Sequence, residues 1–261
     1  MSDRFTPESL RLALGHRPFR FYDVTGSTQD QARAWTTDDP QLPSGAVVIA
    51  EEQEKGRGRQ GRQWISPPET SIMCSVILQP HIVPEQLPRV TMVGAVAVAE
   101  TIAAILPDDV ALKWPNDVLV HGRKICGILA EATWLGNRLN AVILGIGVNV
   151  RTDFSGTDLE GVATSIEGEL GRAVDRHVIL ANLLRHVDSW ERRIDQPALF
   201  DEWRNWLKTL GKHVTVFPQQ EAGQPYEGIA EDIDENGALM VRLASGEVRR
   251  VLAADVGLRE G

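Results

Sequence analysis

Apolar and polar residues along the first 210 positions form blocks that predict a mixture of strands and helices. Runs of mainly apolar residues predict strands at 19–24, 46–53, 71–80 and 138–150. The pattern predicts helices at 7–14, 28–36 and 88–106, and through most of 164–208. Ser27-Thr28 would cap the second of these helices. Residues 117–134 predict two short strands around a turn at His121-Gly122.

The pattern changes after Gly211, where short β runs are separated by glycine, proline and Asn-Gly signals. These runs lie at 213–218, 226–233, 238–243 and 247–252. About fifty residues of this kind fit a small β-barrel. We therefore expect two units, a larger domain at 1–211 that mixes helices and strands and a β-barrel at 212–261.

Composition limits the class of protein. Of the 261 residues, 43% are hydrophobic and 24% charged, so the chain has enough apolar material for a sizeable core. The net charge of -9 argues against non-specific nucleic-acid binding. Cys74 and Cys126 lie singly in apolar runs, which favours core packing in a reducing compartment over a disulfide framework or a zinc site. Since no segment is typical of a signal peptide or a bilayer span, we expect a cytoplasmic protein without a membrane partner.

Residues 54–69 lack any periodicity, and we expect a long functional loop there. The segment 56–62, Gly-Arg-Gly-Arg-Gln-Gly-Arg, combines three glycines with three arginines. Glycine lets backbone N–H groups approach an anion closely, and guanidinium groups bind phosphate or carboxylate. Because the arginines repel one another, we expect the loop to be mobile until an anion neutralises it. A solvated basic loop and an arginine-glycine RNA-binding tract are alternatives, and the spacing is not that of a Walker A loop.

A turn at 113–117, Lys-Trp-Pro-Asn-Asp, is the candidate metal position. Pro115 would end the preceding strand and expose Asn116 and Asp117 as oxygen ligands. Such a pair suits Mg²⁺, which takes one or two protein oxygens together with substrate phosphates. A plain turn is the alternative, because Asn and Asp favour turns for local hydrogen bonding.

Four further positions could belong to a site. Lys124 precedes a strand and could stabilise charge on an acyl or phosphoryl oxygen, or could be an edge lysine. Gly127 and Gly145 interrupt apolar strands, which marks a ligand contact or a bulge. Asn149 is a strand-end cap or a polar group of the site. Since no Ser-His-Asp or Cys-His set has persuasive context, an enzyme here would act by holding anions and stabilising charge.

Six segments, in their order and spacing, resemble biotin protein ligases, which attach biotin to carboxylase carrier domains. They are GSTQD at 26–30, EEQEKGRGRQGRQW at 51–64, KWPND at 113–117, GRKICGILAE at 122–131, GIGVNV at 145–150 and GIAEDIDENGALMV at 228–241. The resemblance implies an α+β fold with a mixed sheet backed by helices and a C-terminal SH3-like barrel. It also implies a two-step ATP- and Mg²⁺-dependent reaction. Biotin's carboxylate attacks the α-phosphate of ATP, giving biotinyl-5′-AMP and pyrophosphate, and a lysine of a biotin carboxyl carrier domain then takes the biotinyl group and releases AMP.

The resemblance also implies roles for particular residues. Lys124, Arg59 and Asp117 would be catalytic, and Asp117 would hold the metal. Biotin would contact Ser27, Thr28, Gln29, Gln53, Arg57, Gly58, Arg59, Lys124, Gly127 and Gly145. ATP or the adenylate would contact Arg59, Arg62, Trp64, Asn116, Lys124 and Asn149.

Two departures and two rivals accompany this resemblance. Gln29 stands where the motif often has Asn, which bears on the biotin contact at that position. Only 26 residues precede Ser27, too few for the helix-turn-helix domain of family members that also repress transcription, so we expect a ligase without DNA-binding activity. The sequence does not reveal the oligomeric state, and the resemblance allows a homodimer, since family members often pair through sheet edges. The nearest rival is a lipoate or octanoyl ligase, although Ser27 and Gln53 suit a ureido ring better than an alkyl tail. The rival from another class is a non-catalytic RNA-binding protein.

Overall fold

A computed structural model describes residues 3–39, 41–218, 224–252 and 254–258. Its larger sheet has seven strands in the order β1-β2-β3-β7-β6-β5-β4. β1 and β2 are parallel and the other neighbouring pairs are antiparallel, so the predicted mixed sheet is confirmed. The strands are β1 Phe19–Thr25, β2 Ala46–Gln53, β3 Ser71–Leu78, β4 Val110–Lys113, β5 Asp117–Val120, β6 Arg123–Leu135 and β7 Arg138–Asn149.

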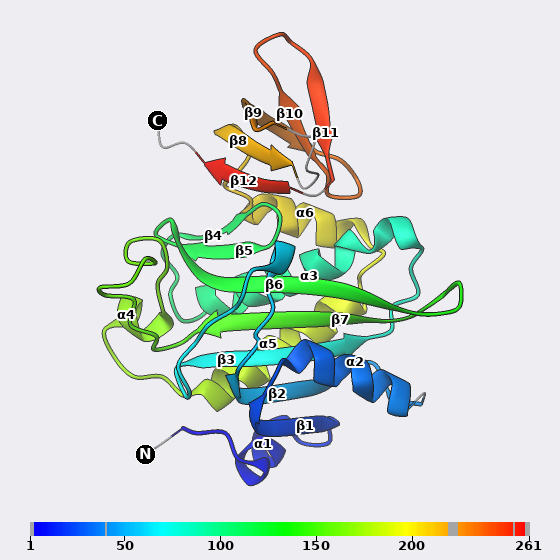
Figure 1. Cartoon of the computed structure of the whole chain (residues 1–261), viewed down its shortest axis with the longest axis vertical. Helices are drawn as coiled ribbons and strands as arrows, with labels where there is room; N and C mark the ends of the chain where they lie inside the picture. The colour runs from blue at the N-terminus through cyan, green and yellow to red at the C-terminus, as the bar shows by residue number, and fades with distance from the viewer. Residues whose placement is uncertain (1–2, 40, 219–223, 253, 259–261) are drawn as a thin grey trace.

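Helices cover the two faces of this sheet unequally (Figure 1). The main core lies between one face and three helices, α3 (Pro88–Ala103), α5 (Arg176–Glu191) and α6 (Pro197–Trp206). A smaller apolar cluster lies on the other face, beneath α2 (Thr28–Asp38). Because α2 covers only part of that face, the loop after β2 can lie over the remainder. The shorter helices are α1 (Pro7–Leu14) and α4 (Ile166–Leu170), with 3₁₀ turns at Arg59–Gly61 and Pro84–Gln86.

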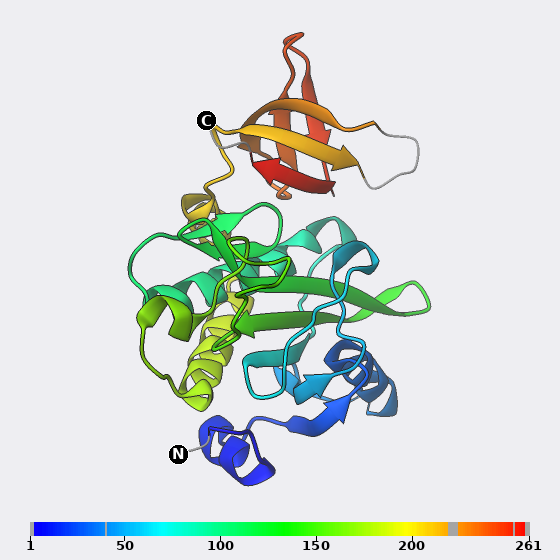
Figure 2. The same cartoon turned by 60° about the vertical axis from the view of Figure 1, so that its left-hand side comes forward.

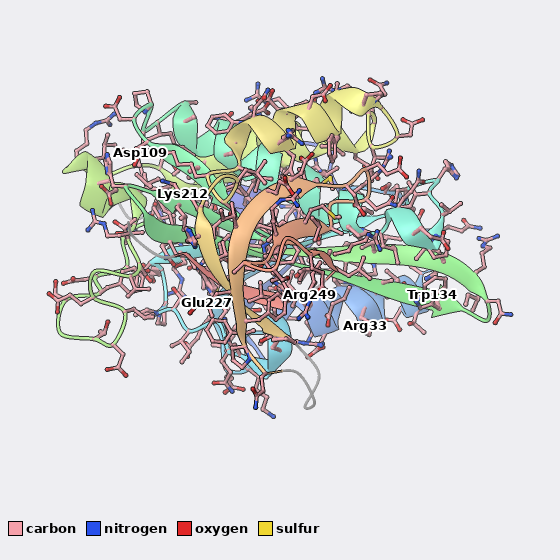
Figure 3. All side chains as sticks on the ribbon, turned by 90° about the horizontal axis from the view of Figure 1, so that it is seen from above. Arg33, Asp109, Trp134, Lys212, Glu227 and Arg249 are labelled. Atoms are coloured by element: carbon pink, nitrogen blue, oxygen red, sulfur yellow. The ribbon has the colours of Figure 1, made fainter. Side chains whose placement is uncertain are left out.

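A five-stranded antiparallel sheet follows α6 and forms the small SH3-like barrel, which lies against the β4–β5 side of the larger sheet (Figures 1 and 2). Its strands are β8 His213–Pro218, β9 Tyr226–Ile233, β10 Leu239–Arg242, β11 Val248–Val251 and β12 Ala254–Leu258. The view from above shows Lys212 and Glu227 on the barrel side and Trp134 at the end of the β6–β7 hairpin (Figure 3). The indole N–H of Trp114 donates to the Gly237 carbonyl at 2.9 Å, so the β4–β5 turn is fastened to the barrel.

Three predicted segments differ from the structure. The two strands predicted in 117–134 around His121-Gly122 are present as β5 and β6, but β6 is not short, because it runs for 13 residues and pairs with β7 from Cys126 to Leu135. α3 ends at Ala103 and not at 106. The strand β12 follows the last predicted β run, 247–252, in a segment where the sequence pattern predicts no strand.

The segment before α1 is fixed by a buried ion-pair network. Arg176 of α5 has a fully buried side chain and contacts both carboxylate oxygens of Glu51, on β2, at 2.9 and 3.0 Å. The Phe5 backbone N–H donates to Glu51 at 2.5 Å, and Asp3 accepts two hydrogen bonds at 2.7 Å from Arg151. Each buried charge therefore has partners, as burial of charge requires. Among the described residues, no helix has the length and apolar character needed to cross a bilayer.

Candidate active site

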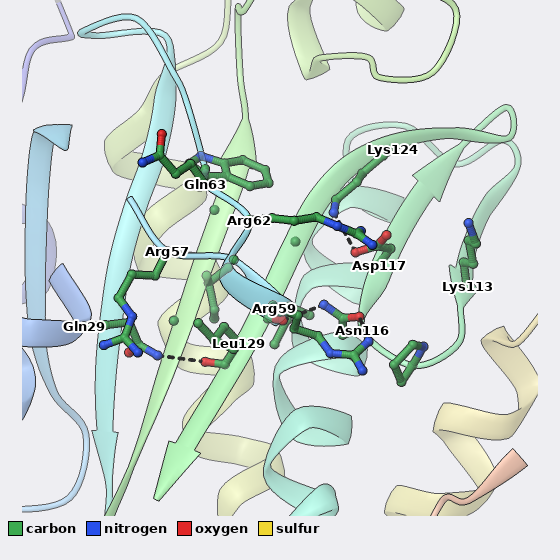
Figure 4. Close-up of a pocket in the computed structure, with 18 of the residues that line it drawn as sticks. Gln29, Arg57, Arg59, Arg62, Gln63, Lys113, Asn116, Asp117, Lys124 and Leu129 are labelled. Carbon is green, nitrogen blue, oxygen red and sulfur yellow. Dashed lines mark hydrogen bonds and ion pairs between the residues drawn. The ribbon is translucent and has the colours of Figure 1, made fainter. Parts of the chain in front are cut away.

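A cavity of about 610 Å³ opens on the face of the sheet that α2 leaves uncovered (Figure 4). It is lined by residues from α2, the 54–69 loop, the β4–β5 turn, β6, β7 and the barrel. All but one of the site residues expected from the sequence line it, namely Ser27, Thr28, Gln29, Gln53, Arg57, Gly58, Arg59, Arg62, Trp64, Asn116, Asp117, Lys124, Gly127 and Gly145. The structure therefore brings together residues that are up to 118 positions apart in the chain, from Ser27 to Gly145.

Asn149 is the exception, since it does not line this cavity. Its side chain is 4% exposed, and its amide N–H donates to the Thr164 carbonyl at 3.0 Å. A second, longer contact of 3.5 Å reaches the Lys124 carbonyl. Of the two alternatives that the sequence left open, the described contacts fit the strand-end cap.

One end of the cavity is neutral, buried and polar. Gln53, at the end of β2, accepts hydrogen bonds from the Thr28 backbone N–H at 2.7 Å and from the Thr28 hydroxyl at 3.1 Å. Ser75 donates to the same hydroxyl at 2.8 Å. Ser27 is the N-cap of α2 and accepts from the Gln29 N–H at 3.3 Å, as its position in the sequence predicts. These bonds hold the side chains rigidly, which suits recognition of a small polar group.

The floor of the cavity is made by glycines on β6 and β7. A Cβ at Gly127 or Gly147 would lie only 2.9 or 2.6 Å from the Trp64 indole, and a Cβ at Gly145 would lie 3.0 Å from Gln29. The three glycines therefore provide room for side chains that lie flat on the sheet. Trp64 Nε1 is buried without a hydrogen-bond partner among the described residues.

The arginine-glycine loop is folded over the cavity and held by carboxylates. Within the loop, Gly58 N–H donates to the Arg62 carbonyl at 2.8 Å. Arg57 contacts Asp30 of α2 and Glu131 of β6, each at 2.7 Å. Acidic side chains of the chain itself thus offset the charge of Arg57, whereas repulsion between Arg59 and Arg62 remains. Whether the loop orders only around an anion stays a prediction.

The other end of the cavity is cationic. Lys124 Nζ lies 2.8 Å from Asp117 Oδ1, and Arg59 donates to the Asn116 side-chain oxygen at 2.9 Å (Figure 4). Burial lowers the pKa of Arg59, and burial likewise lowers the pKa of Lys113, with Lys124 adding like-charge repulsion. A bound polyanion would relieve this crowding of positive charge. Within the described ranges, no three His, Cys, Asp or Glu side chains gather in a way that could hold a metal ion.

Several lining residues were not expected from the sequence. They are Gln63, Cys74, Lys113, Trp114, Pro115, Ile128, Leu129, Ile146, Gly147 and, from the barrel, Phe217, Val256 and Gly257. Gly147 could have been found, because it lies two residues after Gly145 and so faces the same side of a strand. The barrel residues carry no such signal, since their place depends on how the barrel packs. Arg59 also contacts the barrel, at 3.4 Å from the Ala254 carbonyl.

Comparison with known proteins identifies the family. Residues 21–149 match the Biotin/lipoate A/B protein ligase family, and residues 209–259 match the Biotin protein ligase C terminal domain. The chain is 35% identical to a biotin–[acetyl-CoA-carboxylase] ligase of Mycobacterium tuberculosis, over 93% of this chain and 89% of that protein. The chain belongs to the biotin protein ligase family. This ligase is also 31% identical to the bifunctional ligase/repressor BirA of Bacillus spizizenii, over 91% of this chain and 73% of that protein.

Solved structures agree with the fold of this biotin protein ligase. The biotin protein ligase from Aquifex aeolicus, in complex with biotin and ATP, superposes with a TM-score of 0.77. The alignment covers 94% of this chain and 99% of the Aquifex chain at 23% identity, which supports the fold and no more. The prediction of an α+β ligase with a C-terminal SH3-like barrel is therefore confirmed.

Proposed function

We propose that this biotin protein ligase joins biotin to ATP as biotinyl-5′-AMP and transfers the biotinyl group to a lysine of a biotin carboxyl carrier domain. One observation carries the proposal, namely that a single cavity connects a neutral hydrogen-bonding end with a cationic end. Ser27, Thr28 and Gln53 would hold the ureido ring, which has donors and an acceptor for them. The cationic end would hold the carboxylate and the nucleotide phosphates, whose negative charges it offsets.

The first step places two anions in contact. Lys124 and Arg59 would lie against the reacting carboxylate and α-phosphate and reduce their mutual repulsion. Holding both reactants in one cavity supplies much of the remaining acceleration, because the encounter becomes intramolecular. The loop at 54–69 would exclude water from the mixed anhydride until the carrier lysine attacks it. Trp64 would pack beside the adenine.

Mg²⁺ fits the cationic end as a companion of ATP. Asp117 is the one carboxylate among the described residues that line the cavity, and one of its oxygens contacts Lys124. A single carboxylate is typical of Mg²⁺ sites in which substrate phosphates and water complete the coordination. When bound, the ion would supply positive charge to the phosphates.

Two further expectations remain proposals. They are the limits of the two units, at 1–211 and 212–261, and the pairing of two copies as a homodimer.

The rivals are tested by the choice of substrate. The chain should catalyse exchange of labelled pyrophosphate into ATP when biotin is supplied, but not with lipoate or octanoate. Mass spectrometry of the protein incubated with biotin, ATP and Mg²⁺ should find bound biotinyl-5′-AMP. Lys124→Ala should abolish both signals. Lys212→Ala, which changes an exposed lysine, is the matched control and should retain both signals.

Failure of pyrophosphate exchange in folded wild-type protein would refute the proposal. Exchange with lipoate instead of biotin would favour the first rival. Salt-sensitive RNA affinity that survives Lys124→Ala would favour the RNA-binding alternative, which the family relationship already disfavours.

A further inference from the structure

The Gln29 side-chain amide has a fixed orientation beside the cavity. Gln29 is 4% exposed, and its Nε2 donates to the Leu129 carbonyl at 3.2 Å and to Glu131 Oε2 at 3.3 Å. Both partners can only accept, because one is a backbone carbonyl and the other a carboxylate. Turning the amide over would place its oxygen against two acceptors. The NH₂ group must therefore face β6.

This orientation leaves the Gln29 carbonyl oxygen without a partner. Gln29 Oε1 is buried and makes no hydrogen bond with any described residue, although Gln29 itself lines the cavity. A buried amide oxygen without a partner is costly, so it favours a ligand that supplies an N–H or O–H donor. Gly145 makes this position possible, since a Cβ there would approach the Gln29 side chain to 3.0 Å.

Glu131 connects this amide with the arginine-glycine loop. It does not line the cavity, but its side chain is only 22% exposed and receives three groups. One oxygen accepts from Arg57 of the loop at 2.7 Å, and the other lies 3.3 Å from Gln29 Nε2 and 3.4 Å from Arg33. A single carboxylate thus touches both the loop and a residue of the neutral end.

We infer that Glu131 is a positioning residue, which holds the Gln29 amide so that its carbonyl oxygen accepts an N–H of the bound ligand. The inference rests on the proposed function, in which the ligand is biotin and the donor is a ureido N–H. With the amide reversed, its NH₂ would face that N–H, and two donors would oppose each other. Arg57 binds the same carboxylate, so folding of the loop reinforces the orientation.

The test distinguishes the contact of Glu131 with the Gln29 amide from its contact with Arg57 of the loop. Titration calorimetry of the full chain with biotin, without ATP, should show that Glu131→Met raises Kd roughly tenfold, the effect of losing one neutral hydrogen bond. Glu131→Gln retains an acceptor oxygen and should raise Kd less. The kcat of pyrophosphate exchange at saturating biotin should stay within about twofold of wild type for both variants, because the reacting atoms lie at the other end of the cavity. In a Gln29→Met background, Glu131→Met should add less than about twofold in Kd.

Asp30→Asn is the matched control, since it removes the other ion pair of Arg57 and leaves both Gln29 contacts in place. An equal rise in Kd in Asp30→Asn would overturn the inference, as would an undiminished effect of Glu131→Met in the Gln29→Met background. Should Glu131→Met fail to fold, Glu131→Gln takes its place in the same cycle. Wild-type protein that does not bind biotin would refute the proposed function. Wild-type binding with no change in either Glu131 variant would refute this inference alone.

Discussion

Gly147→Ala tests whether the indole of Trp64 must lie flat on β7. The added Cβ would stand 2.6 Å from the indole, whereas ordinary contact begins at 3.4 Å, so the ring would have to retreat by about 0.8 Å. Backbone strain plays no part, because Gly147 is not among the glycines with positive φ. Overpacking of this kind costs about 1–3 kcal/mol. If the indole packs beside adenine, that cost corresponds to a rise in KM for ATP of roughly 5- to 150-fold.

The assay is pyrophosphate exchange with ATP varied at saturating biotin. Gly168→Ala, on α4, is the control for the general effect of replacing glycine, because its nearest neighbour is a Ser165 hydroxyl at 3.0 Å that can rotate away. In a Trp64→Leu background the effect of Gly147→Ala on KM should fall below about twofold. A folded Gly147→Ala variant with unchanged KM for ATP would refute the reasoning.

Four further changes test other parts of the structure. Arg176→Met should lower the free energy of unfolding by about 3–5 kcal/mol in urea titrations, because it leaves the buried Glu51 carboxylate without a counter-charge, and Glu51→Met in the same chain should recover most of it; equal loss in the double variant would contradict this. Burial raises the pKa of Asp3, but hydrogen bonds from its arginine partners outweigh burial and lower the pKa from 3.8 to about 2. The resulting stability, about 2 kcal/mol, should be present above pH 4 and lost as the pH falls to 2, and an Asp3→Asn variant with the same acid dependence would show that Asp3 is not its source. Arg59→Ala should speed release of bound biotinyl-5′-AMP at least about tenfold in a chase experiment, since a charge-assisted contact is lost; an unchanged off-rate would contradict its role. Burial lowers the pKa of Lys113, so kcat/KM for ATP should decline at a lower alkaline pH than an ordinary lysine allows. Lys113→Arg should remove that decline, and identical pH profiles of the variant and the wild type would exclude Lys113 as the titrating group.

Local patterns in the sequence predicted most elements because each apolar run had a clear period or length. The sequence pattern places a strand after His121-Gly122 but does not give its full length, because the run from Cys126 to Trp134 shows no strict alternation of apolar and polar residues. Pairing with β5 at its start and with β7 from Cys126 to Leu135 makes it one strand of 13 residues. β12 was missed for a similar reason, since it depends on antiparallel pairing with β8, which lies far back in the sequence.

The candidate site likewise contains residues that local motifs predict and contacts that only the tertiary structure shows. Motifs predicted Arg59, Lys124 and Asp117, which the structure places around one cavity. The counter-ions of the loop were not predicted, because Asp30 and Glu131 meet Arg57 only when α2 and β6 come together across the sheet. The seven residues of 56–62 alone predict repulsion among their arginines. The tertiary contacts of Arg57 with Asp30 and Glu131 reduce that repulsion.

The sheet beneath the cavity also holds a buried thiol. Cys74 borders the cavity from the core side, 1% exposed, and burial raises the pKa of its thiol to about 12. At pH 8 only about one such thiol in ten thousand is ionised, and the thiolate is the nucleophilic form. If biotinyl-5′-AMP forms in this cavity, as proposed, its acyl group would share the cavity with this sulfur atom. Burial would then protect the enzyme, because it keeps the thiol in its protonated, weakly nucleophilic form.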